Sequence, residues 1–474
     1  MRSRATPGRR RRNVAEKPAD YDVLIIGAGQ AGPPLAIALA KKGWSVAIAE
    51  RKRLGGSCVN FGCTPTKAVI ASARVAHLAR RGRSFGVRIG SVEPDLAAVL
   101  DRARGIVNQS RMGLREALAN EMNLRLIEGH ARFDGRDGKS FRLHVGEETV
   151  HARKVVIDTG TRSRIPSVHG LENIDYRTAE NWLDRPLLPR HLLVLGGSYT
   201  GLEMAQFYRR MGSAVTVVEE GPEIVRREDP DVSLALRRLL EAEEIAFRLG
   251  HAAARVEAVP DGIRLSFRHG GGRETLAGTD LFVATGRRPN TDDLGLETIG
   301  LEPEKDGTIR VTKRLASKVR GVWAVGDVRG GPMFTHTAWD DYRILLSQLT
   351  GDRSRTTDRI VPYAIYTDPQ LGRVGMTETE AKSRGRRVRV GRFEMRQNGK
   401  AREIGETEGF VKVVVGGSSG RILGAAVLST EAAELVHLFV DVMNAGGTFA
   451  AIRDAIHVHP TLAEAIQSAV ASVK

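Results

Sequence analysis

The chain has 474 residues with a net charge of +16, and 41% of its residues are hydrophobic. At about 150 residues per domain, this length predicts roughly three domains with sizeable cores. The chain has only two cysteines, which excludes a disulfide framework and predicts a protein of the reducing cytoplasm. A close cysteine pair in such a chain is typical of redox or metal chemistry.

Residues 1–20 form a basic segment, whose first twelve residues include six arginines and no acidic residue. We interpret the segment as a disordered leader, and the alternative is an arm that binds nucleic acid. Residues 23–40 form an apolar run long enough to imitate a membrane span, but three glycines and two prolines interrupt it. This pattern favours a buried strand, a tight turn and a helix in a soluble chain.

The same run carries a dinucleotide-binding pattern. A strand at residues 23–26 is followed by Gly27, Gly29 and Gly32 in G-x-G-x-x-G spacing and then by an alanine-rich helix. The glycines allow a tight turn and a close approach of the backbone to a pyrophosphate at the helix N-terminus. The next strand ends on Glu50, whose carboxylate can accept hydrogen bonds from ribose hydroxyls. The segment therefore predicts a Rossmann-like domain.

Both cysteines lie in the stretch GGSCVNFGCTPTK, where Cys58 and Cys63 enclose four residues. A continuous helix would put these positions on different faces, so a bridge needs an irregular or just-starting helical turn, which Gly62 and Pro65 suit. A helix from about Thr64 would lower a thiol pKa through its positive end. A zinc site would need further ligands nearby, and a structural bridge closing so small a loop would stabilise little. We favour a redox-active disulfide.

The dinucleotide pattern recurs at residues 191–220. A strand precedes Gly196-x-Ser198-x-x-Gly201, and a helix and a second strand ending on Glu219 follow. Ser198 replaces the middle glycine, which slightly hinders backbone approach there. Two such patterns predict two bound nucleotides.

Glu219 bears on which nicotinamide nucleotide is used. Its charge would repel the 2′-phosphate of NADP(H) and accept a hydrogen bond from a free 2′-hydroxyl, which favours NAD(H). Arg226 and Arg227 lie close behind in the sequence and could bind a phosphate instead.

GGSCVNFGCTPTK resembles the redox-active signature of the class I flavoprotein pyridine nucleotide-disulfide oxidoreductases, which include dihydrolipoamide dehydrogenase, glutathione reductase and mercuric reductase. Other stretches that resemble family motifs follow in the family's order: GAGQAG at 27–32, DTG at 158–160, GGSYTGLE at 196–203, ATGRRPN at 284–290, VWAVGDV at 322–328 and HVHPTLAE at 457–464. The resemblance implies an α/β fold of two Rossmann-like dinucleotide-binding domains plus a C-terminal α+β dimerisation domain.

The expected domains follow this order. After the leader at 1–20, we expect an FAD domain at 21–158, an NAD(P) domain at 159–289, a return to the FAD domain at 290–355, and the dimerisation domain at 356–474. The resemblance also implies a homodimer with shared active sites.

The resemblance assigns FAD to the first fold and the nicotinamide nucleotide to the second. Lys67 and Glu203 match an ion pair beside the flavin, where an ammonium would favour the negative charge of the reduced ring. Tyr199 matches a residue that gates the nicotinamide pocket. The full set of expected cofactor-binding residues is Gly27, Gly29, Gly32, Glu50, Ser57, Lys67, Ala131, Gly160, Gly196, Tyr199, Gly201, Glu203, Glu219, Gly286 and Asp327.

The catalytic roles also follow from the resemblance. Cys63 matches the thiol stacked on the flavin, and Cys58 matches the outer thiol that meets the substrate, so electrons would pass from NADH through FAD to the Cys58–Cys63 bridge. His459 would carry protons for the partner subunit's disulfide, oriented by Glu464. The alternative for Glu464 is a capping box with Thr461 that opens the helix beginning at residue 462.

The substrate is the least determined feature of the sequence. GAGQAGPPLA, CVNFGCTPTK and FTHTAWDDYRIL most resemble mercuric-reductase-like members, whereas HPTLAE resembles dihydrolipoamide dehydrogenase and glutathione reductase. We therefore predict an NAD(P)H-dependent reductase of a disulfide or a soft metal ion, with no resident metal site, no membrane partner and no nucleic-acid partner. The alternative is a dihydrolipoamide dehydrogenase that passes electrons to NAD⁺.

Overall fold

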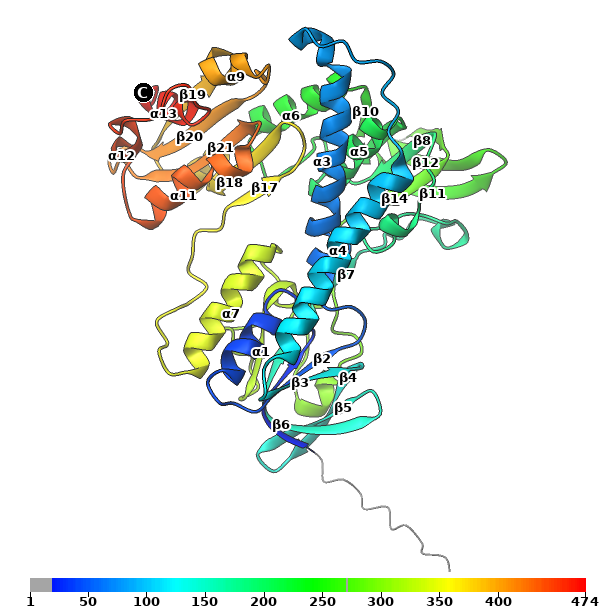
Figure 1. Cartoon of the computed structure of the whole chain (residues 1–474), viewed down its shortest axis with the longest axis vertical. Coiled ribbons are helices and arrows are strands. Elements are labelled where there is room, and N and C mark those ends of the chain that lie inside the picture. The colour runs from blue at the N-terminus through cyan, green and yellow to red at the C-terminus, as the bar shows by residue number, and fades with distance from the viewer. Residues whose placement is uncertain (1–18, 270–271) are drawn as a thin grey trace, which may run out of the picture.

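The computed structural model describes residues 19–269 and 272–474, in three lobes (Figure 1). The first eighteen residues of the predicted leader lie outside this range. The lower lobe of Figure 1 contains the first sheet, and two upper lobes contain the second dinucleotide fold and the C-terminal domain.

The first lobe contains a seven-stranded sheet in the order β3-β2-β1-β6-β5-β4, with β16 paired to β6. Strands β1, β2, β3, β6 and β16 pair in parallel, whereas β4 and β5 extend the sheet antiparallel. The elements are β1 Ala19–Ile26, α1 Gly32–Ala40, β2 Val46–Glu50, β3 Leu124–Glu128, β4 Ala131–Asp137, β5 Ser140–Val145, β6 Glu148–Ile157, β16 Val322–Ala324 and α7 Thr335–Leu349. The predicted apolar run thus forms β1, a glycine turn and α1, in which Pro33 lies in the first turn.

Two long helices rise from this lobe toward the upper lobes (Figure 1). They are α3, Cys63–Arg80, and α4, Leu96–Ala119, which contact each other, and α3 also contacts α5 of the second fold. The Asp95 side chain caps α4 by accepting from the Ala98 N–H at 3.1 Å. The short helix α2, Gly56–Asn60, precedes α3.

The second fold repeats the plan as a four-stranded parallel sheet in the order β10-β9-β8-β14. An antiparallel sheet of β11, β12 and β13 projects beside it, and β7 pairs with β15 between the folds. The elements are β7 Thr161–Ser163, β8 His191–Leu195, α5 Tyr199–Met211, β9 Ala214–Glu219, α6 Pro230–Ala242, β10 Ile245–Leu249, β11 Ala252–Val259, β12 Gly262–His269, β13 Gly272–Gly278, β14 Asp280–Val283 and β15 Arg287–Pro289.

The C-terminal lobe is an antiparallel sheet in the order β17-β18-β21-β20-β19 with helices packed on it. Its strands are β17 Tyr363–Ile365, β18 Gln370–Gly375, β19 Val388–Glu394, β20 Phe410–Gly416 and β21 Ile422–Ser429. Its helices are α8 Glu378–Ser383, α9 Gly399–Glu403, α10 Ala432–Leu435, α11 His437–Asn444, α12 Ala450–Arg453 and α13 Glu464–Ala471. The predicted α/β fold with two Rossmann-like domains and an α+β C-terminal domain is confirmed.

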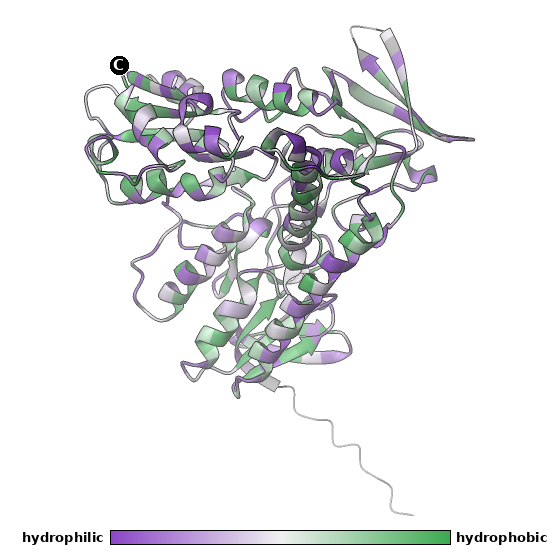
Figure 2. Cartoon of the chain, turned by 45° about the horizontal axis from the view of Figure 1, so that its top comes forward, coloured by the Kyte–Doolittle hydropathy of each residue, from purple (hydrophilic) through white to green (hydrophobic). Residues whose placement is uncertain are grey.

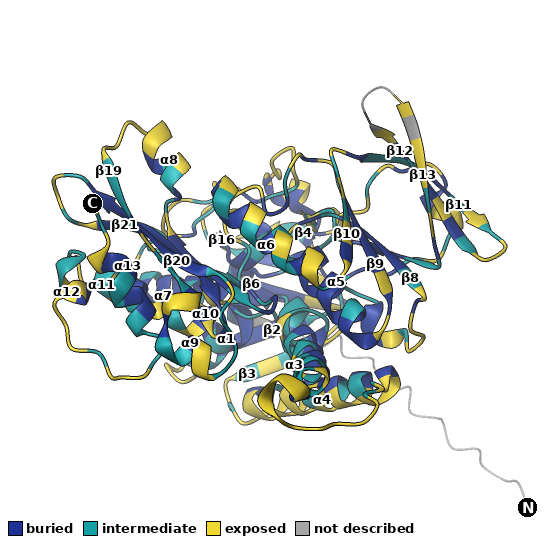
Figure 3. Ribbon diagram, turned by 90° about the horizontal axis from the view of Figure 1, so that it is seen from above, coloured by how far each residue is buried: buried dark blue, intermediate teal, exposed yellow. Residues whose placement is uncertain are grey.

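The strands inside the sheets are mostly buried (Figure 3), and their residues are largely hydrophobic (Figure 2). Val23, Leu24 and Ile25 of β1 are fully buried, as expected for a parallel strand covered on both faces. Within the described ranges, none of the helices has the length and apolar character that a membrane crossing requires.

Candidate active site

One cavity of about 1420 Å³ connects both glycine turns with the cysteine pair. Among the predicted cofactor-binding residues, all but Gly32 and Gly201 line it, and so do Cys58 and Cys63. Gly32 and Gly201 lie behind the turns, where a Cβ atom would come within 2.6 Å of the Gly27 carbonyl oxygen and 2.0 Å of the Gly196 carbonyl oxygen. The third glycine of each pattern therefore serves helix–strand packing.

The first glycine of each pattern is constrained in the same way. Gly27 and Gly196 have φ angles of +102° and +109°, and a Cβ on either would lie 2.4 Å from a carbonyl oxygen, that of Asp158 or of Ala284. Only glycine tolerates both the left-handed backbone and this close approach.

The predicted ribose-binding carboxylates are held by backbone N–H groups. Glu50 accepts from Ala28 at 2.9 Å and from Lys52 at 2.8 Å. Glu219 accepts from Gly197 and Gly221, both at 2.8 Å. Because both carboxylates line the cavity, their remaining lone pairs can accept from ribose hydroxyls.

The cysteines lie on two helices separated by a break. Cys58 is in α2, and Cys63 is the first residue of α3, one residue before the predicted start. Both thiols are free. A hydrogen bond from Cys58, helped by the Thr335 hydroxyl and the Lys67 charge, lowers the pKa of Cys63 to about 6, and the hydrogen bond with Cys63 together with burial raises the pKa of Cys58. In the reduced pair, Cys63 is therefore the thiolate at neutral pH and Cys58 holds the proton.

Lys67 and Glu203 form the expected ion pair, with Nζ and Oε2 2.9 Å apart. Burial works to lower the pKa of Lys67, but the charge and hydrogen bond of Glu203, together with the charges of Cys63 and Tyr366, raise it overall. The second oxygen of Glu203 accepts from the Tyr366 N–H at 2.8 Å, and the Lys67 ammonium lies 4.4 Å from the Tyr366 ring centroid. The lysine is thus a fixed positive charge beside the cysteines.

His459 and Glu464 contact each other but do not line the cavity. The His459 Nδ1 atom lies 3.0 Å from Glu464 Oε1, and the His459 side chain is 77% exposed. A hydrogen bond from the Thr461 N–H and one from His459 lower the pKa of Glu464. Because an ionised carboxylate only accepts, Nδ1 is the donor. Among the described residues, no hydrogen bond reaches Nε2.

The structure shows one of the two hydrogen bonds that the capping-box alternative requires. Glu464 Oε2 accepts from the Thr461 N–H at 2.7 Å, but the Thr461 hydroxyl donates to the Val458 carbonyl. Helix α13 begins at Glu464, not at residue 462. The two oxygens of one carboxylate therefore serve the backbone and the histidine together.

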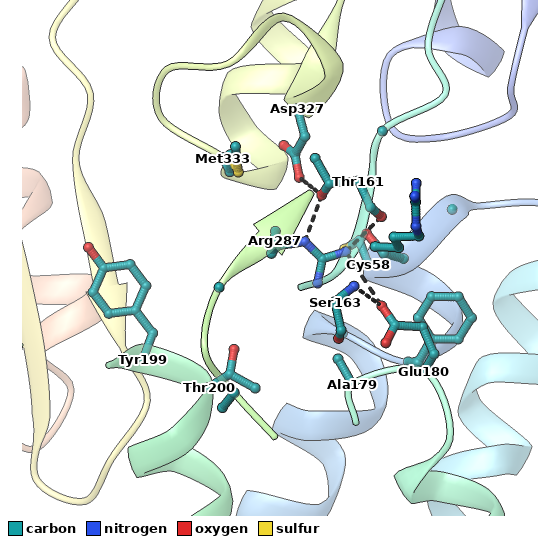
Figure 4. A pocket seen from close by; sticks show the side chains of 18 of the residues that line it. Cys58, Thr161, Ser163, Ala179, Glu180, Tyr199, Thr200, Arg287, Asp327 and Met333 are labelled. Atoms are coloured by element: carbon teal, nitrogen blue, oxygen red, sulfur yellow. Dashed lines mark hydrogen bonds and ion pairs between the residues drawn. The ribbon is translucent and has the colours of Figure 1, made fainter. Parts of the chain in front are cut away.

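The sequence did not single out a chain of contacts across the cavity (Figure 4). The Arg287 Nε–H donates to the Thr161 hydroxyl at 2.6 Å, and this hydroxyl donates to Asp327 Oδ2 at 3.1 Å. Burial raises the pKa of Asp327, and the Arg287 charge opposes the shift. Arg287 lies inside the motif ATGRRPN, and Asp327, which was predicted to bind the cofactor, lies inside VWAVGDV.

Two further contacts were not predicted, although Phe334 and Thr335 open the stretch FTHTAWDDYRIL. The Thr335 hydroxyl, at the start of α7, lies 3.2 Å from the Cys63 sulfur. Tyr199 packs on Phe334 and Tyr363, with ring centroids 6.1 Å and 5.7 Å away, and the Tyr363 hydroxyl donates to Glu228. The expected nicotinamide gate thus rests on aromatic rings from two other parts of the chain.

The cavity fits FAD in the first fold. It extends without interruption from Glu50 past the Gly27 turn to Cys63 and Lys67. Gly160 also lines it, and a Cβ there would meet no protein atom within 4 Å, so the chain leaves that space open. Among the described residues, no group of three or more His, Cys, Asp and Glu side chains is placed to hold a metal ion.

Comparison with known proteins decides the family. Residues 21–341 match the pyridine nucleotide-disulphide oxidoreductase family, and residues 361–470 match its dimerisation domain. The chain belongs to this family. It is an FAD-dependent pyridine nucleotide-disulfide oxidoreductase with a dimerisation domain, which confirms the predicted family, the enzyme class and the use of FAD.

Relatives that match this chain over nearly their whole length include dihydrolipoyl dehydrogenases and RclA. The chain is 33% identical to a dihydrolipoyl dehydrogenase of Cupriavidus necator, covering 96% of this chain and 98% of the relative. It is 32% identical to RclA of Escherichia coli, a probable pyridine nucleotide-disulfide oxidoreductase, covering 96% and 99%. The Cu(II) complex of the HOCl-induced flavoprotein disulfide reductase RclA superposes with a TM-score of 0.87 at 32% identity, covering 96% of this chain and 100% of that one.

Proposed function

We propose that the protein uses NAD(P)H to reduce a small-molecule disulfide or a soft metal ion through Cys58 and Cys63. The supporting observation is the asymmetric cysteine pair in a cavity shared by two dinucleotide turns. For a disulfide the balance is NAD(P)H, one proton and RSSR giving NAD(P)⁺ and two RSH. We propose the cytoplasm as the location, because a dithiol of this kind works in a reducing compartment.

Each residue around the pair has a proposed task. FAD, when bound, supplies two-electron exchange between the nicotinamide and the cysteines. Lys67, fixed by Glu203, places a positive charge where negative charge accumulates on reduction. Thr335 and the start of α3 stabilise the Cys63 thiolate. Cys58, which holds the proton, attacks the substrate disulfide once that proton is removed.

We assign the proton acceptor for Cys58 to His459 of the partner subunit. Within one chain His459 and Glu464 lie outside the cavity, and His459 is exposed with Nε2 free. A homodimer in which each C-terminal lobe completes the other subunit's site would bring Nε2 to Cys58. Glu464 fixes the imidazole and stabilises its protonated form.

We propose NADH as the preferred nucleotide. The Glu219 carboxylate is held by two N–H groups and faces the cavity, so a 2′-phosphate would meet its charge. Arg226 and Arg227, which could bind a 2′-phosphate instead, also line the cavity, and Arg226 lies 3.9 Å from Glu219.

The candidate substrates are a disulfide, a soft metal ion and, for the reverse reaction, dihydrolipoamide. One set of assays separates them. A soft metal ion could bind the two thiolates directly, and the Cu(II) complex of RclA is a precedent in a relative. The relatives named dihydrolipoyl dehydrogenase favour the reverse reaction, in which dihydrolipoamide reduces NAD⁺. We therefore propose measuring NADH and NADPH consumption with lipoamide, glutathione disulfide, Hg(II) and Cu(II), and NAD⁺ reduction with dihydrolipoamide. Lipoamide turnover in both directions without metal reduction would replace the proposed reductase by the dehydrogenase.

A further inference from the structure

The two dinucleotide folds differ at one buried position behind their glycine turns. Asp158 follows β6, and Ala284 follows β14. A Cβ on the first glycine of either turn would lie 2.4 Å from the carbonyl oxygen of the corresponding residue. Each is also the first residue of a matching triplet, DTG or ATG. The first fold therefore carries a carboxyl group where the second carries a methyl group.

The Asp158 side chain reaches into the first turn. Its Oδ2 accepts from the Gly32 N–H at 2.8 Å, at the start of α1. A Cβ on Gly29 or on Gly32 would lie 2.9 Å from the same oxygen. The carboxyl group thus packs against the inner side of the turn, and both Asp158 and Gly29 line the cavity.

The charges around Asp158 disfavour a negative carboxylate. The residue is 5% exposed, and among the described residues no salt bridge reaches it. Asp341 of α7 is also buried, at 0% exposed, but unlike Asp158 it is paired with Arg329 at 2.6 Å and with Arg359 at 2.7 Å. Burial raises the pKa of Asp158 well above the usual aspartate range. The backbone N–H groups of Gly32 and Gly29 act to lower it, and the negative charges of Asp327 and Asp341 act to raise it.

A pyrophosphate at this turn would add negative charge on the outer side. It would lie at the α1 N-terminus across one glycine backbone from Asp158, in a site with little water to screen the repulsion. The pyrophosphate and an ionised Asp158 would therefore oppose each other, whereas a protonated Asp158 would still accept from the Gly32 N–H.

We propose that Asp158 is a positioning residue for FAD, whose neutral carboxyl group holds the glycine turn in the shape that receives the pyrophosphate. FAD binding and Asp158 protonation are then linked, and the affinity for FAD falls as pH rises through the range where Asp158 of the FAD-free protein loses its proton. The other ionisable groups facing this region are Asp327 and Arg329 of the 3₁₀ helix Gly326–Arg329, Asp341 of α7, and Arg287 of β15, which neighbours Asp327.

The test measures FAD release from the purified flavoprotein. The holoenzyme and an Asp158→Asn variant are diluted at pH values from 6 to 9.5, and free FAD is quantified by its fluorescence at equilibrium. For the unaltered chain we expect the dissociation constant to rise by up to tenfold per pH unit in the titrating range. Asn cannot ionise but keeps an oxygen for the Gly32 N–H, so the variant should bind FAD with a shallower pH dependence.

Parallel pH profiles for the two proteins overturn the proposal, and so does an affinity that is flat with pH in both. An Asp158→Ala variant, which copies Ala284, should bind FAD more weakly than Asp158→Asn at low pH and share its shallow slope. Since other groups near the flavin titrate in both proteins, the difference between the profiles isolates Asp158. Bound FAD at pH 6 verifies cofactor binding separately.

Discussion

The two dinucleotide folds share the backbone arrangement of their glycine turns but differ in the side chains around those turns. In both, a Cβ on the first glycine would lie 2.4 Å from a carbonyl oxygen, and a terminal glutamate accepts from two backbone N–H groups. The first fold adds Asp158 behind its turn and Lys67 and the cysteines beside the cavity, whereas the second adds Tyr199. We therefore propose that backbone geometry allows a dinucleotide to bind, and that side chains determine which dinucleotide it is and which chemistry it takes part in.

The largest effect is expected outside both folds, at His459. His459→Ala should lower disulfide turnover by about 10²- to 10⁴-fold, because Cys58 loses its proton acceptor. Reduction of the enzyme by NADH should stay normal, since both dinucleotide turns are intact. Stopped-flow and steady-state assays separate these steps, and normal disulfide turnover would contradict the assignment.

The two glycine turns can be disrupted separately by substituting the third glycine of each. Gly201→Ala places a Cβ 2.0 Å from the Gly196 carbonyl oxygen, and Gly32→Ala places one 2.6 Å from that of Gly27. We expect each substitution to weaken binding of the nucleotide in its own fold by about 10- to 100-fold, because overpacking costs roughly 1–3 kcal/mol. Titrations should show that Gly201→Ala keeps FAD but binds NADH poorly, and that Gly32→Ala releases FAD. Loss of both nucleotides in both variants would mean that the folds are not independent.

The difference at Asp158 can be transferred to the second fold. Ala284→Asp should place a buried carboxyl group behind the Gly196 turn and weaken NADH binding by roughly tenfold, equivalent to about 1.4 kcal/mol. The loss should grow with pH, because only the ionised form repels the NADH pyrophosphate. Fluorescence titration with NADH at pH 6 and pH 9 measures it, and Ala284→Asn is the uncharged control. An equal loss in both variants at both pH values would show a steric effect alone.

A smaller effect is expected at the thiolate. Thr335→Val removes the hydroxyl 3.2 Å from the Cys63 sulfur and should raise the pKa of Cys63 from about 6 by about one unit. The rates of steps that need the Cys63 thiolate should rise with pH near 6 in the unaltered protein. In the variant they should rise at a higher pH. A pH titration of thiolate absorbance in the reduced enzyme checks this, with Thr335→Ser as the control that keeps the hydroxyl.

The sequence predicted the parts of the site that depend on local spacing. Glycine spacing placed both turns, strand ends placed Glu50 and Glu219, and the break around Gly62 placed Cys63 at a helix start. Each of these features is set within about 25 residues along the chain, where pattern and backbone geometry constrain each other.

The contacts that sequence reasoning missed join distant segments. Thr335 and Cys63 are 272 positions apart, and Asp158 and Gly32 are 126 apart. No period or motif indicates such a pair, because it depends on how whole lobes pack. For Glu464 the sequence predicted that the capping and catalytic roles could coexist only with compromise. In the structure its two oxygens take two donors at once.

The most direct test of the central claim is a thiol count, since the chain has only two cysteines. After mild aerobic oxidation the denatured protein should show no free thiol, and after anaerobic reduction with excess NADH it should show two per subunit. A Cys63→Ser variant should show one thiol under both conditions. Two free thiols that persist through oxidation, or none that appear after NADH, would contradict electron transfer through a Cys58–Cys63 disulfide.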